Sequence, residues 1–525
     1  MYDSQYVIVD EAFFGQARTG TINGIRYPAA IRQDIDSDLK ALDLLDILEH
    51  TRLTAESQPH LYETLELLDN GEIIVVANAL SLAQRPKKML QALNKIREKY
   101  GFSRLVYFPG VADPYLVPVL VYAGVSFFDA SYAIIEGRSG LRYGPLGKVR
   151  TGKDESSSNL NFLASIFDDL GSSIKNGSLR DLVEKVTLSS KSVEILRLMD
   201  STFYDIQEAS FPRRTGFILA NSLQSLSRPD IRRYREFVSL SYEKPKSAEI
   251  LLLIPCSAKK PYSESKTHRK LINSLGNLRK YVHEVIITSP VGLVPRDLEK
   301  VYPPAFYDIP VIGQWYGEEK EMINEMLRLY LSRNHYQHVI AFVPNDLEFI
   351  RDAIPSDALY LTWQKGNENE FQALKNHISD LISGQGKSKR DFLREEIISA
   401  CVYSYGQWIE PYVSNCKIFN RYDRFILLED GQTAMVFDPL SGRATISRRA
   451  AEWFLKNGRF LVEIDDFKPT SNIYPVGIKS VGEEIRPGDD VVVHFNGEFR
   501  GIGTAKMPRK AMLTLKRGVA VKMRN

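Results

Sequence analysis

The chain has 525 residues, of which 44% are hydrophobic and 25% charged, and its formal net charge is +3. These proportions exclude a disordered, collagen-like or low-complexity chain, and the length predicts roughly three to five domains. Three widely spaced cysteines cannot form a disulfide framework or a cysteine-rich zinc site, which favours a reducing compartment. The longest apolar runs are strand-sized and the first residues lack the features of a secretory signal, so we expect a cytoplasmic protein without a membrane span.

The first third of the chain alternates between short apolar runs and amphipathic stretches. This alternation predicts parallel strands joined by right-handed helical crossovers, in a barrel or an open sheet. The serine-rich stretch 151–161 predicts a loop or boundary. The predicted strands are Ile73–Val76, Leu105–Phe108 and Val125–Phe128, and the predicted helices are Asp38–His50, Leu61–Leu68, Pro86–Tyr100 and Tyr115–Tyr122.

A second segment with α/β patterning follows the linker Glu243–Lys246. It ends at another linker, Ser383–Lys389, and from about Gly431 short strands separated by turns predict an all-β region. The predicted strands of the second segment are Glu249–Ile254, Val285–Thr288, Val339–Val343 and Leu359–Thr362, and its predicted helices are Lys266–Tyr281 and Glu318–Arg333.

The densest set of reactive side chains lies in the loop Pro255–His268, directly after the first strand of this second segment. Fourteen residues there carry a thiol, several hydroxyls, three lysines, a tyrosine and a histidine. Ligands of parallel α/β sheets bind at the carboxyl ends of strands. Nearby lysines and a helix start lower a thiol pKa, so Cys256 is predicted to be a reactive thiolate. The alternative is a buried, inert cysteine in a turn.

A second polar run, 289–310, follows the strand Val285–Thr288 and should lie along the same sheet edge. Its carboxylates Glu299 and Asp308 could hold an amine there. An ordinary proline-rich connection is the alternative reading.

The C-terminal stretch 500–525 contains eight basic residues and no acidic one, which predicts a phosphate-binding surface or, equally, a solvated basic tail. His335 and His338 have no acidic or cysteine partner at ligand spacing, and the phosphate-binding pattern GxxxxGK[ST] is absent. The sequence therefore predicts neither a metal site nor a cofactor. The basic residues are Arg500, Lys506, Arg509, Lys510, Lys516, Arg517, Lys522 and Arg524.

The loop Pro255–His268 resembles the signature of the archaeal archaeosine synthase family, Pro-Cys-Ser-x-x-Lys-Pro-Tyr-x-x-Ser-x-Ser-His. It departs only at Thr267, which keeps the hydroxyl. The run Gly292–Pro310 resembles the family's next characteristic block, beyond which Ile312 and Tyr316 replace the usual Thr and Asp.

The resemblance extends over most of the chain. Tyr107–Ala133 is similar to part of the barrel of archaeal tRNA-guanine transglycosylase, and Asp129 stands where that enzyme carries its nucleophilic aspartate. The zinc motif of the transglycosylase is missing, and the interval before Lys246 is too short for a complete barrel. Gly431–Asn525 resembles a PUA domain, a small RNA-binding barrel.

The resemblance implies an α/β multidomain protein. Residues 1–243 would form a truncated TIM-barrel-like transglycosylase domain with a helical extension, and residues 247–383 a second α/β sheet domain carrying the Cys256 loop. A small α+β pre-PUA domain over 390–430 and an all-β PUA barrel over 431–525 would follow.

The implied function is a transferase that adds an amino-acid amine, lysine in the better-understood members, to the nitrile of 7-cyano-7-deazaguanine in tRNA. Cys256 would be the nucleophile, with Lys259 favouring its thiolate and His268 donating a proton. The partners would be tRNA, the amino acid and, in some archaea, a radical S-adenosylmethionine enzyme; a homo-oligomer is compatible with the sequence. The expected substrate-binding residues are Ser257, Lys260, Tyr262, Ser263, Ser265, Glu299 and Asp308, and the expected tRNA-binding residues are Arg500, Lys506, Arg509 and Lys510.

Two alternatives belong to other classes. One is a transglycosylase that uses Asp129 covalently, against which the missing zinc cysteines argue. The other is a non-catalytic subunit that binds tRNA for a partner enzyme.

Overall fold

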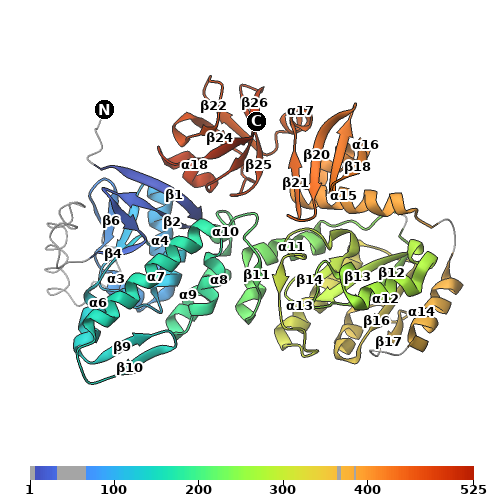
Figure 1. Cartoon of the computed structure of the whole chain (residues 1–525), viewed down its shortest axis with the longest axis horizontal. Helices are drawn as coiled ribbons and strands as arrows, with labels where there is room; N and C mark the ends of the chain where they lie inside the picture. Colours follow the sequence, from blue (N-terminus) through green and yellow to red (C-terminus); the bar gives the residue numbers. More distant parts are fainter. Residues whose placement is uncertain (1–5, 32–66, 247, 364–367, 383–385, 525) are drawn as a thin grey trace. The chain divides into compact units, whose positions relative to one another are not determined.

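The computed structural model describes residues 6–31, 67–246, 248–363, 368–382 and 386–524. The chain forms two compact units (Figure 1). Unit 1 comprises residues 1–216 and 454–525, and unit 2 comprises residues 217–453. Within the described ranges, no helix is long and apolar enough to cross a membrane.

The N-terminal part of unit 1 contains a five-stranded sheet in the order β4-β8-β7-β6-β5. Strands β4, β8, β7 and β6 are parallel, whereas β5 pairs antiparallel with β6. The parallel pairing predicted from the sequence is therefore confirmed. The elements are β4 (Ala29–Ile31), β5 (Leu67–Asp69), β6 (Ile73–Val76), α3 (Ala79–Ala83), α4 (Pro86–Tyr100), β7 (Leu105–Phe108), α5 (Val117–Tyr122) and β8 (Phe127–Asp129).

The start of helix α7 (Ser156–Asn176) differs from the sequence prediction of a loop over 151–161. The backbone N–H of Ser156 donates to the carboxylate of Asp154 (2.8 Å), which satisfies a free donor at the helix start. Leu163, Phe167, Leu170 and Ile174 then bury one stripe of the helix. The predicted helix Asp38–His50 lies outside the described residues, as does Leu61–Leu68 except for its last two residues, which belong to strand β5.

The remaining elements of this part include a three-stranded antiparallel sheet and a hairpin. They are β1 (Ile8–Phe14), β2 (Ala17–Ile22), β3 (Ile25–Tyr27), α6 (Ser131–Arg138), β9 (Leu141–Gly144), β10 (Gly147–Arg150), α8 (Leu179–Val186), α9 (Ser190–Asp200) and α10 (Tyr204–Glu208).

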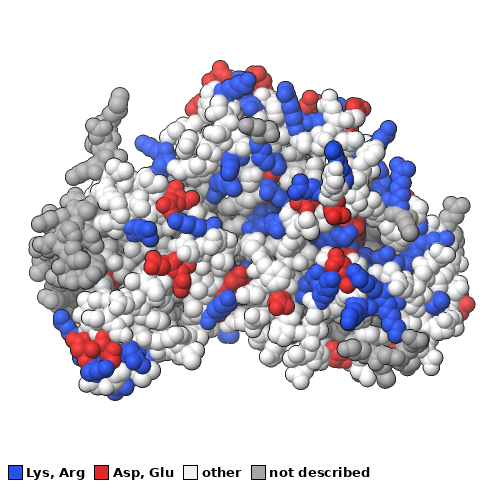
Figure 2. Space-filling model, in the orientation of Figure 1, with Lys and Arg blue, Asp and Glu red and all other residues white. Residues whose placement is uncertain are grey.

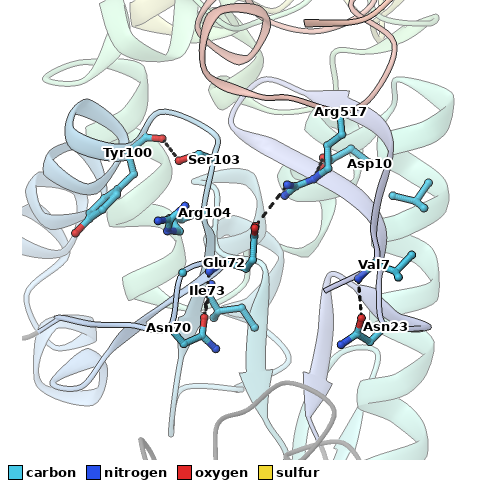
Figure 3. Close-up of polar contacts among 12 residues, drawn as sticks. Val7, Asp10, Asn23, Asn70, Glu72, Ile73, Tyr100, Ser103, Arg104 and Arg517 are labelled. Atoms are coloured by element: carbon cyan, nitrogen blue, oxygen red, sulfur yellow. Dashed lines mark hydrogen bonds and ion pairs between the residues drawn. The ribbon is translucent and has the colours of Figure 1, made fainter. Parts of the chain in front are cut away.

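The C-terminal part of unit 1 is a six-stranded sheet in the order β23-β27-β26-β25-β22-β24. The guanidinium of Arg517 joins it to the N-terminal part through ion pairs with Asp10 (Nε to Oδ2, 2.8 Å) and Glu72 (Nη1 to Oε2, 3.4 Å) (Figure 3). The backbone N–H of Phe102 also donates to the hydroxyl of Thr514 (2.9 Å). The elements are α17 (Arg448–Asn457, which spans the unit boundary), β22 (Leu461–Ile464), β23 (Asn472–Ile473), β24 (Ile478–Val481), β25 (Asp490–Phe495), β26 (Glu498–Ala505), α18 (Arg509–Thr514) and β27 (Val521–Arg524).

Unit 2 is built on a five-stranded sheet in the order β14-β13-β12-β16-β17. Strands β13, β12, β16 and β17 are parallel, and the edge strand β14, which the sequence did not predict, is antiparallel to β13. Residues 250–254 of β12 are fully buried, as expected for a central strand. The elements are α11 (Pro229–Leu240), β12 (Ile250–Pro255), α12 (Lys266–Leu275), β13 (Val282–Thr288), β14 (Gly292–Pro295), α13 (Gly317–Arg333), β16 (His338–Val343), β17 (Leu359–Thr362) and α14 (Glu368–Leu381).

The rest of unit 2 combines helices with a four-stranded antiparallel sheet and a short two-stranded ladder. The elements are β11 (Ile218–Leu219), β15 (Tyr307–Asp308), α15 (Lys389–Tyr405), α16 (Glu410–Asn415), β18 (Lys417–Arg421), β19 (Arg424–Glu429), β20 (Gln432–Asp438) and β21 (Arg443–Ile446).

Candidate active site

Cys256 directly follows the central strand β12, at the carboxyl edge of the sheet in unit 2. Its backbone N–H donates to the carbonyl of Ile287 in β13 (3.1 Å). The preceding carbonyl, that of Pro255, accepts a hydrogen bond from His268 Nε2 (3.0 Å). Both sides of the peptide bond that leads into Cys256 are therefore held, and the residue itself is half-buried.

The environment of the Cys256 thiol contradicts the prediction of a lowered pKa. Burial raises the thiol pKa, and the Asp346 carboxylate adds to the increase, whereas a hydrogen bond with Thr288 and the charge of Lys260 only partly offset it. Burial also lowers the pKa of Lys260, whose ammonium lies 4.0 Å from the centre of the Tyr307 ring. The site thus holds a thiol and an amine whose pKa values have moved towards each other.

His268 is a buried anchor of the loop rather than a ring that titrates near neutral pH. Its Nδ1 accepts a hydrogen bond from Arg296 Nη2 (2.8 Å), so Nε2 carries the proton that is donated to Pro255. Burial and the positive charge of Arg296 lower the pKa of His268 to about 4. The expected role of His268 as a proton donor is therefore wrong, since a charged ring here would face a buried guanidinium.

Arg296 also binds two buried carboxylates. Its Nε lies 2.5 Å from Glu284 Oε2, and its Nη1 lies 2.7 Å from Glu299 Oε2. Glu299 Oε2 additionally accepts the backbone N–H of Ser263 (2.9 Å). Burial opposes ionisation of both carboxyl groups. Arg296 and Ser263 nevertheless lower the pKa of Glu299, and Arg296 and Arg279 lower the pKa of Glu284 to about 2. Of the two carboxylates predicted to hold an amine, Glu299 is thus buried and paired, whereas Asp308 is exposed.

A chain of buried hydroxyls extends from the thiol. The Tyr307 hydroxyl lies 2.6 Å from Thr288 Oγ1 and 2.7 Å from the Tyr262 hydroxyl. Sequence reasoning singled out Tyr262 but missed Thr288 and Tyr307. Thr288 ends a predicted strand and Tyr307 lies within the polar run 289–310, and neither position reveals a contact between separate segments.

The other predicted residues of the loop have local partners. Ser265 is the N-cap of α12 and accepts the backbone N–H of His268 (3.1 Å). Ser257 Oγ donates to the carbonyl of Lys259 (3.1 Å). The Lys259 ammonium pairs with the exposed Glu264 (3.1 Å), so Lys260, not Lys259, is the lysine that acts on the thiol.

The predicted tRNA-binding residues divide into two groups. Arg500 pairs with Asp466 (2.8 Å), and Arg509 donates to the Val481 carbonyl (2.9 Å). Lys506 and Lys510 are exposed. Figure 2 shows acidic side chains interspersed with the basic ones on the face in view. The count of basic residues after Arg500 therefore overstates the positive surface, because acidic partners come from elsewhere in the chain.

Asp129, at the end of β8 in unit 1, is buried and fully engaged. Its carboxylate accepts hydrogen bonds from the backbone N–H groups of Gly110 and Ser131 and from the Ser131 hydroxyl. Both oxygens are therefore occupied by neighbouring loop residues. No group of three or more His, Cys, Asp or Glu side chains within the described ranges is arranged to hold a metal ion.

Comparison with known proteins places this site in a family. Residues 467–525 match the PUA domain, and residues 231–381, which include the Cys256 loop, match a domain of unknown function, DUF5591. The chain is 43% identical to archaeosine synthase subunit alpha of Thermoplasma acidophilum over 99% of its own length and 100% of that protein. The chain belongs to the archaeosine synthase family.

More distant relatives agree with this assignment. Archaeosine synthase of Methanocaldococcus jannaschii is 29% identical over 87% of the chain and 80% of that protein. tRNA-guanine(15) transglycosylase of Methanococcus vannielii is 23% identical over 68% of the chain and 50% of that protein.

Proposed function

We propose that this protein is a tRNA-modifying transferase of archaeosine biosynthesis. It adds the amine of an amino acid, with lysine as the donor, to the nitrile of 7-cyano-7-deazaguanine in tRNA. Membership of the archaeosine synthase family and the PUA match support tRNA as the substrate. The observation that carries the reaction is the position of Cys256, a half-buried residue on a fixed peptide at the carboxyl edge of the central sheet.

The reaction proceeds in two additions. The Cys256 sulfur forms a bond to the nitrile carbon, and the nitrile nitrogen takes the thiol proton, which gives a thioimidate. The donor amine then adds to the same carbon, and the carbon–sulfur bond breaks. The sulfur leaves with a proton from the amine, so the free thiol is regenerated and the product is an amidine. No oxidant or reductant is consumed.

Lys260 transfers the proton in these steps, and Asp308 binds the incoming amine. Burial lowers the pKa of Lys260, so more of its side chain is the neutral amine that can accept the thiol proton as sulfur attacks. The positive charge that Lys260 then carries partly offsets the effect of burial, which raises the pKa of Cys256. Lys260 then returns the proton to the nitrile nitrogen. The exposed carboxylate of Asp308 holds the incoming amine. His268 acts as a positioning residue, since both of its ring nitrogens are used to hold the loop.

The N-terminal part of unit 1 is, in this proposal, a remnant of a transglycosylase barrel that docks tRNA and exchanges no base. The engaged carboxylate of Asp129 supports this. The expected domain boundary at 430/431 falls in the turn between the paired strands β19 and β20 of unit 2, and the expected boundary at 243 lies beyond the end of the first segment of unit 1 at residue 216. Neither boundary agrees with the fold. We also propose that a radical S-adenosylmethionine enzyme completes the conversion. The name of the Thermoplasma relative, a subunit alpha, supports a partner subunit.

The test is to incubate the protein with tRNA that carries the cyano base and with single amino acids. Mass spectrometry of the digested nucleosides should show an adduct of base plus lysine, and Cys256→Ala should give none. A Cys256→Ala protein that forms the adduct would refute the covalent route. A wild-type protein that forms no adduct with any amino acid would refute the proposed function.

A further inference from the structure

The segment 309–316 of unit 2 is largely exposed, mostly apolar and without a charged residue. It leads from β15 to helix α13 and has the sequence Ile-Pro-Val-Ile-Gly-Gln-Trp-Tyr. Val311, Ile312 and Tyr316 are 47%, 68% and 66% exposed. Single exposed apolar residues are common on protein surfaces, whereas several gathered in one uncharged segment indicate a surface that binds a ligand or a partner.

The N-terminal end of this segment is fixed beside the residues that surround the thiol. Tyr307 and Asp308 form β15, which pairs in parallel with β11. The Lys260 ammonium lies 4.0 Å from the centre of the Tyr307 ring. The Tyr307 hydroxyl lies 2.6 Å from Thr288 Oγ1, and Thr288 is a hydrogen-bond partner of the Cys256 thiol. The segment therefore begins next to the reactive group of the site.

The C-terminal end of the segment is fixed beside Asp346, which follows strand β16. Trp315 Nε1 donates to Asp346 Oδ2 (2.9 Å), and the Trp315 ring packs edge-on against the Phe349 ring, with centres 5.7 Å apart. The middle of the segment approaches the same carboxylate, since a Cβ on Gly313 would lie 3.6 Å from Asp346 Oδ2. This carboxylate faces the thiol as well, because it contributes to the raised pKa of Cys256.

The length of the chain keeps the exposed side chains close to these two anchors. A fully extended chain spans at most about 3.6 Å per residue. Ile312 is four residues from Asp308 and three from Trp315, so its Cα lies within about 14 Å of the first Cα and about 11 Å of the second. Tyr316 directly follows Trp315, and its backbone N–H donates to Glu319 Oε2 (2.9 Å) at the start of α13. Both residues are therefore held at the edge of the sheet that carries the thiol.

We propose that the segment 309–316 is the surface on which the substrate base stacks, with Tyr316 and Ile312 in contact with its ring. Enzymes that react with a base in a nucleic acid take it out of its stack and hold it against aromatic and apolar side chains. An uncharged segment suits such a ring, whereas a phosphate requires cations or N–H donors. The inference rests on the proposed function, because it takes the base whose nitrile meets Cys256 as the ligand. It adds which residues hold that base.

The test compares two tRNAs that differ only at the modified position, where one carries the cyano base and the other an abasic site. The full chain with Cys256→Ala forms no covalent bond, so fluorescence anisotropy measures binding alone. The ratio of the two dissociation constants gives the contribution of the base, because contacts to the rest of the tRNA cancel. Adding Tyr316→Ala should reduce this ratio about fivefold or more, as expected when an aromatic ring that stacks on a base is lost. Ile312→Ala should reduce it about threefold, and Tyr316→Phe, which keeps the ring, should preserve it.

The control is Tyr422→Ala, which removes an 87% exposed tyrosine of the same unit, in the turn between β18 and β19, and should leave the ratio unchanged. Because Tyr316 and Ile312 are exposed, their substitution should not change the melting temperature.

The outcomes separate this inference from the proposed function. If Tyr316→Ala and Ile312→Ala keep the ratio, either by binding normally or by weakening both tRNAs equally, the segment is not the surface that holds the base. A parent protein that binds the two tRNAs equally would also overturn the inference, and both results leave the proposed reaction standing if the wild type forms the lysine adduct. A reduced ratio would support the segment even if no adduct formed and the proposed reaction failed.

Discussion

Replacing Arg296 with leucine tests the buried network that holds the Cys256 loop. Arg296 is only 9% exposed and is bonded to His268, Glu284 and Glu299. Its loss leaves Glu299 without a charged partner, and Glu284 with Arg279 alone. Removing one partner of a buried ion pair costs about 3–5 kcal/mol.

The pKa of Glu284 gives an independent value for the stabilisation of the folded state by this network. Its decrease from 4.5 to about 2, against the opposing effect of burial, corresponds to about 3 kcal/mol of stabilisation of the folded state, to which both Arg296 and Arg279 contribute and of which the charge of Arg296 is the largest favourable part. A carboxyl whose pKa is lowered on folding stabilises the fold above its unfolded pKa, and that stabilisation disappears as the pH falls through the folded value. The difference between wild type and Arg296→Leu should therefore be complete above about pH 5 and decrease towards pH 2.

Tryptophan fluorescence during urea unfolding is the appropriate assay, because all four tryptophans of the chain lie in unit 2 (Trp315, Trp363, Trp408 and Trp453). Arg296→Leu should lower the free energy of unfolding of this unit by about 3 kcal/mol. The control is Arg351→Leu, which removes an exposed pair with Glu348 and a contact with the Tyr360 ring, and should cost about 1 kcal/mol. Equal losses for the two variants at neutral pH would refute the reasoning.

Two further results are expected. Asp129→Asn should leave nitrile conversion within a few-fold of wild type, because its carboxylate is occupied by hydrogen bonds; a loss of about a thousandfold in a folded protein would restore a catalytic role. The log of kcat/KM for nitrile conversion should rise with a slope of about 1 from neutral pH to beyond pH 8.5, because attack requires the Cys256–Lys260 pair to have lost one proton and burial raises the Cys256 pKa; a plateau at pH 7 would contradict a raised pKa.

The elements of the fold that could be predicted from the sequence were those with a strong local pattern. Helix α4 and strands β6 and β7 begin and end where the sequence predicts, since a proline starts the helix and fully buried apolar runs form the strands. The start of α7 could not be predicted, because a serine-rich stretch usually favours turns and the Asp154 contact that stabilises it here depends on the folded backbone.

The sequence identified the loop that carries the site, but it did not predict which residues from other segments contact that loop. The sequence placed Cys256 at a strand end, which is correct, but it assigned the thiolate to Lys259, whereas the charge of Lys260 is the one that acts on the thiol. The low pKa of His268 comes from burial and from the charge of Arg296, which is 28 residues away in the sequence. Arg517 likewise finds its partner, Asp10, at the other end of the chain. Contacts of this kind follow from tertiary structure and leave no local pattern.

Covalent attack by Cys256 on the cyano base is the central claim, and trapping the adduct tests it most directly. The protein is incubated with tRNA that carries the cyano base, without any amine donor, and the complex is analysed by denaturing electrophoresis and mass spectrometry. We expect a protein–RNA adduct attached at Cys256 that disappears when lysine is added and does not form with Cys256→Ser. Lysine addition to the base by a Cys256→Ser or Cys256→Ala protein, with no trapped adduct in the wild type, would contradict the account.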